Sequence, residues 1–204
     1  DFFPAGWDLE RMDELAGRPP ERIGEREEYW SEGYEPVECE SVEDLEIRMG
    51  VEIATQVIEA RAEGRQLALI LPVGPMGMYR WAIDRLEKEN VSCDHVWGFN
   101  MDEWSDAEGN TLPGDAPGSF QNAMEEAFYD RLGELTVPPE QRYFATRERL
   151  EQYPGKIAEL RAEGAKLVVV YGIGRALHIA FWEPTFAAEY ESAAEWKKTT
   201  HRIG

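Results

Sequence analysis

The chain has 204 residues, of which 43% are hydrophobic and 30% charged, a composition typical of a soluble globular protein with a buried core. Lys and Arg number 21 against 41 Asp and Glu, and the resulting net charge of −20 argues against a nucleic-acid partner, which needs a basic stripe. No apolar run reaches the roughly 18 residues of a membrane-spanning helix, and no signal peptide is visible. The two cysteines match no disulfide, metal or redox spacing, so we expect a reduced, cytoplasmic compartment.

Residues 1–40 differ from the rest because they combine four prolines with charges and scattered aromatic side chains. We expect them to form an irregular N-terminal arm, which either packs its aromatics on the main domain or contacts another subunit. The second alternative makes a homo-oligomer plausible. From residue 41 the pattern becomes regular, and residues 41–204 are expected to form one α/β domain.

The first half of this domain predicts a helix, a strand and a second helix. Ser41 and Asp44 form a capping box, and apolar residues then recur at helical spacing until Gly64 offers a C-terminal stop. Residues 67–72 are a continuous apolar run, as expected for a strand buried on both faces. A glycine-containing turn then leads into the next helix.

The second half repeats this alternation. Residues 94–100 predict a strand, Ser119 caps a helix, residues 147–163 predict another helix with Pro154 as a kink or late start, and 166–171 predict a further buried strand. Apolar strands alternating with helices predict a doubly wound, mostly parallel, Rossmann-like α/β sheet. Ligands of such sheets bind beyond the carboxyl ends of the strands, so the residues that follow each strand are the candidates for function.

Two motifs follow the first two predicted strands. The turn with Gly74 and Gly77 opens a helix whose backbone amides can face a phosphate. Two glycines before a helix are common, so a plain tight turn is the alternative. Asp102 and Glu103 follow the strand 94–100. They are either acids that cap a helix in a solvated loop, or they include a base that abstracts a proton from a sugar carbon.

The third motif follows the strand 166–171 and runs from Gly172 to Pro184. It contains His178, which is one of only three histidines and follows a Gly-x-Gly turn. A lone histidine is more often structural than catalytic. The carboxylate of Glu183 could orient the imidazole and raise its pKa.

Taken together, the three motifs resemble those of the glucosamine-6-phosphate deaminase family, in the sugar-phosphate isomerase superfamily that also includes the 6-phosphogluconolactonases. The resemblance rests on a glycine-rich loop after Leu-Pro, on Phe-Asn-Met-Asp-Glu at 99–103, and on Gly-Ile-Gly…His-Ile-Ala-Phe-x-Glu-Pro at 172–184. It covers residues 41–184. It is closer to the deaminases than to the lactonases, whose corresponding motifs lack the Phe-x-Glu-Pro ending.

The resemblance implies a role for each motif. Asp102 would be the base that moves a proton between C1 and C2 of an open-chain sugar, and His178 would assist ring opening with Glu183 tuning it. Other residues would contact the substrate or its phosphate: Gly74, Gly77, Glu103 and Arg175. No metal or organic cofactor is implied, and the only expected partner besides a further copy of the chain is a small-molecule sugar phosphate.

The sequence departs from the family pattern in ways that make the site less polar. Ala176 and Leu177 stand where the family has Asp-Gly, and Trp182 replaces an asparagine. Pro75 and Met76 replace hydroxyl side chains in the phosphate loop, and a proline also lacks an amide donor.

These departures bear on phosphate and on function. Phosphate binding is expected to be weaker than in the family or to rely on Arg175 and Arg80. The chain ends at Gly204, where the family continues into further strands and a phosphate-binding lysine, so we expect a C-terminally truncated domain. An aldose–ketose isomerase or deaminase of an (amino)sugar phosphate is the favoured function. A non-catalytic sugar-phosphate sensor or scaffold and a lactonase-like hydrolase are the alternatives.

Overall fold

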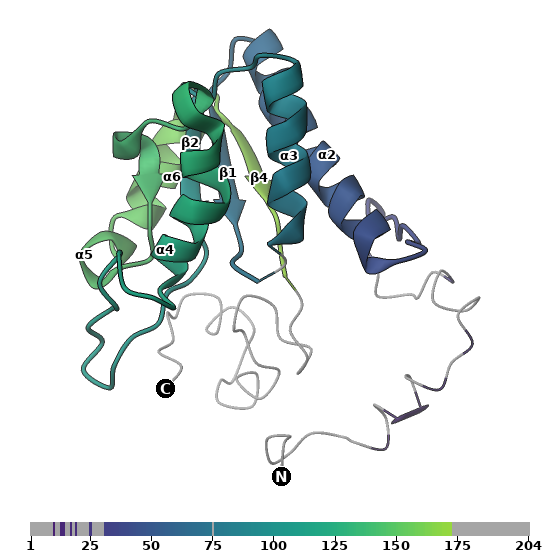
Figure 1. Cartoon of the computed structure of the whole chain (residues 1–204), viewed down its shortest axis with the longest axis horizontal. Helices are drawn as coiled ribbons and strands as arrows, with labels where there is room; N and C mark the ends of the chain where they lie inside the picture. The colour runs from purple at the N-terminus through teal and green to yellow at the C-terminus, as the bar shows by residue number, and fades with distance from the viewer. Residues whose placement is uncertain are drawn as a thin grey trace.

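The architecture is a parallel sheet between helices (Figure 1). The computed structural model describes residues 31–74 and 76–172, with isolated positions at 10, 13, 14, 17, 19 and 25. Within these residues, four strands lie in the order β3-β2-β1-β4, and every neighbouring pair is parallel. The predicted α/β class with a doubly wound parallel sheet is therefore confirmed. The strands are β1 (Leu67–Leu71), β2 (Val96–Asn100), β3 (Arg142–Tyr143) and β4 (Lys166–Val169).

Helices cover both faces of the sheet. One face carries α2, α3 and the helical segment that begins with α4, and the opposite face carries α6 (Figure 1). The α-helical bounds are α2 (Val42–Ala62), α3 (Gly77–Lys88), α4 (Phe120–Met124), α5 (Arg147–Leu150) and α6 (Tyr153–Ala162). The segment after α4 continues as a π-helix and then as 3₁₀ turns, at Glu125–Tyr129, Asp130–Leu135 and Pro139–Gln141.

The start and end of α2 follow the sequence prediction. The Ser41 hydroxyl accepts a hydrogen bond from the Asp44 amide at 3.1 Å, and the Asp44 carboxylate accepts one from the Glu40 amide at 3.2 Å. The first bond satisfies an amide that the first helical turn leaves without an intrahelical partner, and the second ties the residue before the N-cap to the same turn. Gly64, just past the end, has a φ of 65°, a conformation that favours glycine.

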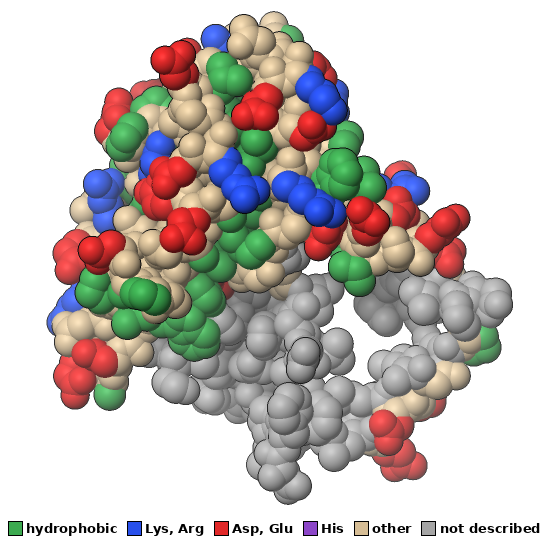
Figure 2. Space-filling model, viewed as in Figure 1, with side chains coloured by type: hydrophobic (Ala, Val, Ile, Leu, Met, Phe, Trp, Pro, Cys, Tyr) green, Lys and Arg blue, Asp and Glu red, His purple; other side chains and the backbone are tan. Residues whose placement is uncertain are grey.

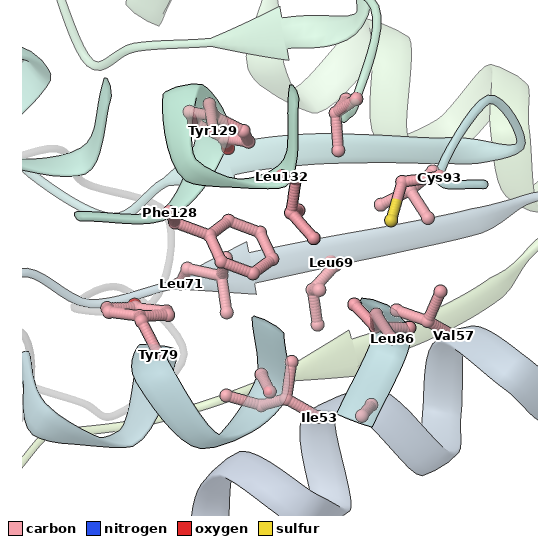
Figure 3. Packing of buried hydrophobic residues seen from close by; sticks show 14 of the residues in the cluster. Ile53, Val57, Leu69, Leu71, Tyr79, Leu86, Cys93, Phe128, Tyr129 and Leu132 are labelled. Carbon is pink, nitrogen blue, oxygen red and sulfur yellow. The ribbon is translucent and has the colours of Figure 1, made fainter. Parts of the chain in front are cut away.

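Two hydrophobic cores lie on the two faces of β1 and β2. In the larger one, Leu69 and Leu71 contact side chains from α2, α3 and the π-helical segment, and Figure 3 shows them beside Ile53, Tyr79 and Phe128. The smaller core lies against α6 and contains Ala68, Phe99, Leu160 and Ala165. Burial of apolar side chains on both faces of the central strands holds the carboxyl ends of these strands in place.

Gly98 in β2 makes room for Tyr129. The Tyr129 hydroxyl lies where a Cβ atom of residue 98 would be, and it has no hydrogen-bond partner among the described residues. We expect Gly98→Ala to lower the free energy of unfolding by about 1–3 kcal/mol, because the added methyl group overpacks the core. Tyr129→Phe should be neutral or stabilising alone, and it should restore most of the loss in the double variant. Urea denaturation of the four proteins measures this, and a double variant no more stable than Gly98→Ala contradicts it.

Several elements differ from the sequence prediction. β2 begins two residues late, because Asp94 pairs with Arg61 at 2.6 Å in the preceding turn. The predicted helix 147–163 is divided into α5 and α6, with Pro154 in the first turn of α6, where the missing amide hydrogen is tolerated. Within the described residues β4 lies at one edge of the sheet, and Leu167 is 36% exposed rather than buried.

One face of the molecule is mixed in charge, and the described helices do not have the character of membrane spans. On the face shown in Figure 2, acidic side chains are scattered among Lys and Arg rather than gathered in one patch. In the part of the chain that the structure describes, no helix has the length and apolar character needed to cross a membrane.

Candidate functional site

The first two motifs leave the same edge of the sheet from neighbouring strands. β1 and β2 are paired so that Leu71 lies opposite Asn100, and β4 is paired on the other side with Val169 opposite Ile70. The glycine turn, the acidic pair and residues 170–172 therefore all begin at the carboxyl edge. The ends of β1, β2 and β4 therefore lie side by side at one edge of the sheet.

The third motif is outside the described residues from residue 173 onward. The predicted site residues Arg175, His178 and Glu183 lie in that part, as do the departures at 176, 177 and 182. Their place in a common pocket with Asp102 stays a prediction. Pro75 of the glycine turn is likewise outside the described residues.

Asp102 is half-buried just beyond the end of β2. The amide of Met101 donates a hydrogen bond to the Leu71 carbonyl at 3.0 Å, so pairing with the neighbouring strand continues to the residue before Asp102. Burial raises the pKa of the Tyr79 and Tyr153 hydroxyls, and the Asp102 charge raises it further in both. The charge of Asp102 therefore acts on one tyrosine of α3 and one of α6.

These two tyrosines brace the strand ends. The Tyr79 hydroxyl of α3 donates to the Pro72 carbonyl at 2.6 Å. The Tyr153 hydroxyl of α6 lies 3.0 Å from the Asn100 carbonyl and 2.7 Å from the Tyr143 carbonyl, and can donate to either. Since their pKa values are raised, both phenols keep the protons that these hydrogen bonds need.

Asn100 is a functional candidate that sequence reasoning missed. Its side chain is 1% exposed, and neither its amide nitrogen nor its amide oxygen has a hydrogen-bond partner within the described residues. Leaving a buried polar group unsatisfied costs about 1–3 kcal/mol, so such groups call for a physical explanation. The available signal was an asparagine closing an otherwise apolar strand two residues before Asp102.

Glu103 points to the start of α4. One carboxylate oxygen accepts hydrogen bonds from the amides of Trp104 and Phe120, and the other accepts one from Gln121, all at 2.9 Å. Both oxygens are thus engaged by backbone amides. The predicted contact of Glu103 with substrate stays untested, while these bonds match the alternative that the acid caps a helix.

The glycine turn combines the expected backbone with an unexpected carboxylate. Gly74 has a φ of 155°, which favours glycine, and Gly77 begins α3. The Glu46 carboxylate of α2 lies where a Cβ atom of Gly77 would be. Arg80, expected to help hold a phosphate, pairs instead with Glu43 at 3.4 Å and with Glu46 at 3.5 Å.

A separate hollow of about 300 Å³ lies between α4 and the segment after β3. Its two arginines are engaged: Arg142 pairs with Glu125 at 2.6 Å, and Arg149 lies over the Tyr143 ring at 5.0 Å. None of its lining residues belongs to the three motifs. Over the described ranges, no three His, Cys, Asp or Glu side chains gather to hold a metal ion.

No protein-family model matches the chain, but comparison with known proteins finds similar sequences. A glucosamine-6-phosphate deaminase of Caenorhabditis elegans is 32% identical over 140 residues, which are 65% of this chain and 48% of the relative. A glucosamine-6-phosphate deaminase of Erwinia tasmaniensis is 32% identical over 150 residues, 67% of this chain and 50% of the relative. Over the aligned part, the chain is similar to glucosamine-6-phosphate deaminases. It spans about half the length of these curated relatives.

A solved structure has a similar fold. It is described as a monomeric glucosamine-6-phosphate deaminase and a missing link of the NagB superfamily. It is 24% identical and superposes with a TM-score of 0.57 over 72% of this chain and 58% of its own. At that identity the likeness shows the fold alone.

Proposed function

We propose that the chain is an aldose–ketose isomerase or deaminase of an amino-sugar phosphate, with Asp102 as its base. The observation that carries this proposal is the register of β1 and β2. It brings the Asp102 end of β2 beside the Gly74–Gly77 turn at one edge of the sheet. The relatives' shared name, glucosamine-6-phosphate deaminase, supplies the substrate class.

In this reaction the Asp102 carboxylate takes the proton from C2 of the open-chain sugar and returns a proton to C1, and while the carboxyl group holds the proton it can exchange with solvent. The carboxylate is held by a backbone paired with β1 up to Met101. The hydroxyls of Tyr79 and Tyr153 fix the neighbouring carbonyls on either side. A base must lie within hydrogen-bond reach of the proton that it abstracts, and a braced strand end provides such a fixed position.

Proton exchange tests the proposed function directly. The whole chain is incubated with glucosamine 6-phosphate in deuterated water, and the C2 proton is followed by NMR. We expect enzyme-dependent loss of the C2 proton signal, and release of ammonia if the deaminase reaction goes to completion. Unphosphorylated glucosamine is the matched control and should exchange more slowly. Absence of exchange with glucosamine 6-phosphate and with other hexose phosphates would overturn the proposal.

A further inference from the structure

Glu103 closes the loop that separates β2 from α4. The loop runs from the end of β2 at Asn100 to the start of α4 at Phe120. The Glu103 carboxylate accepts hydrogen bonds from the amides of Phe120 and Gln121, which are 17 and 18 residues further along the chain. Hydrogen bonds to an ionised acceptor are roughly twice as strong as those between neutral groups. The two ends of the loop are therefore held together by hydrogen bonds to a carboxylate.

Asp102 lies between two such fixed points. On one side the Met101 amide is bonded to the Leu71 carbonyl of β1. On the other side Glu103 is bonded to the first turn of α4. Asp102 is the single residue between the two anchored residues, Met101 and Glu103. Little freedom therefore remains for the backbone that carries the Asp102 carboxylate.

We propose that Glu103 is a positioning residue, which holds the carboxylate of Asp102 in its reactive place by tying it to α4. This inference rests on the proposed function and deepens it. A displacement of about 1 Å at a reacting group can cost on the order of a hundredfold in rate, so a tie this close to the base has a catalytic consequence. Glu103 itself makes no contact with the reacting atoms in this proposal.

Ser119 provides the control that separates positioning from helix capping. Its hydroxyl accepts a hydrogen bond from the Asn122 amide at 2.9 Å, in the same first turn of α4. Ser119 and Glu103 thus both satisfy free amides of one helix, but only Glu103 is adjacent to Asp102. A role confined to helix capping predicts similar effects for the two residues, and a positioning role predicts different ones.

The experiment compares Glu103→Gln with Ser119→Ala in the full chain. Glutamine keeps the length of the side chain but turns an NH₂ group toward donor amides. For C2 exchange of glucosamine 6-phosphate, we expect kcat to fall at least tenfold in Glu103→Gln with KM within about twofold. Ser119→Ala should stay within about twofold in both. Equal losses in the two variants, or a change in KM alone, would overturn the proposal.

Two additional measurements keep the test decisive. If Glu103→Gln does not fold, Glu103→Asp keeps the charge but draws the carboxylate back by one methylene, and the same fall in kcat is expected. If the unmutated chain shows no exchange, the proposed function fails, but the positioning of the Asp102 carboxylate by Glu103 can still be tested. The ¹³C signal of the Asp102 carboxyl should then shift or broaden in the Glu103 variant and not in Ser119→Ala, and an unchanged signal in both would overturn the positioning role.

Discussion

Replacing Asp102 by asparagine is expected to lower the rate of C2 proton exchange by about a hundredfold to ten-thousandfold, the range lost when a positioned general base is removed. The amide has nearly the shape of the carboxylate but cannot accept the proton. Asp102 is half-buried at the end of β2, and its backbone is held by the strand pairing before it. The variant should therefore fold normally, and KM should change much less than kcat.

The matched control for this substitution is Asp115→Asn. Asp115 is an exposed acid of the same loop, so its substitution makes the same change in net charge. It should leave kcat and KM within about twofold of the unmutated chain. Circular dichroism and thermal unfolding of both variants establish that the fold is kept. Undiminished exchange by a folded Asp102→Asn protein would remove Asp102 from the mechanism.

The sequence predicted the sheet because its signals are local. Capping at Ser41, the stop at Gly64 and the apolar runs at 67–72 and 166–171 each depend on a few adjacent residues, and each appears at or near the predicted place. The two-residue strand β3 gave no signal, because two residues cannot show a period. Its pairing with β2 depends on tertiary contacts alone.

The candidate site was predicted where it depends on the strand ends and was missed where it depends on packing. The position of Asp102 follows from β2 and from the family resemblance. The destination of the Glu103 carboxylate depends on a loop that returns 17 residues later, which no local pattern reveals. The Tyr153 hydroxyl reaches Asn100 across 53 residues of sequence, so its bracing role required the assembled fold.

The placement of Glu46 is a further consequence of packing. Gly50 of α2 lies against the backbone of α3, where an added Cβ would clash with the Met78 carbonyl. Glu46 lies one turn before Gly50 on α2, so this close approach of the two helices brings its carboxylate to Gly77 of α3. A negative charge of the chain itself thus lies beside the turn that we propose for the substrate phosphate.

Replacing Glu46 by glutamine is expected to tighten the binding of glucosamine 6-phosphate by roughly tenfold or more. Two unit charges about 6 Å apart repel by roughly 3 kcal/mol at an effective dielectric constant of 20, and each 1.4 kcal/mol is about a factor of ten in affinity. The Glu46 side chain is 24% exposed, so solvent reduces this repulsion only in part. Loss of the charge also frees Arg80 from one of its two acidic partners.

Glu43→Gln is the matched control, because Glu43 pairs with the same arginine at 3.4 Å but its side chain is 68% exposed. If release of Arg80 were the main effect, both variants would bind the sugar phosphate more tightly. If repulsion at the glycine turn dominates, as we expect, only Glu46→Gln gains, and inorganic phosphate shows the same preference. Calorimetry at constant ionic strength measures both ligands, since salt screens exposed charges more than partly buried ones. Equal affinities of Glu46→Gln and the unmutated chain for both ligands would place the phosphate away from Gly77.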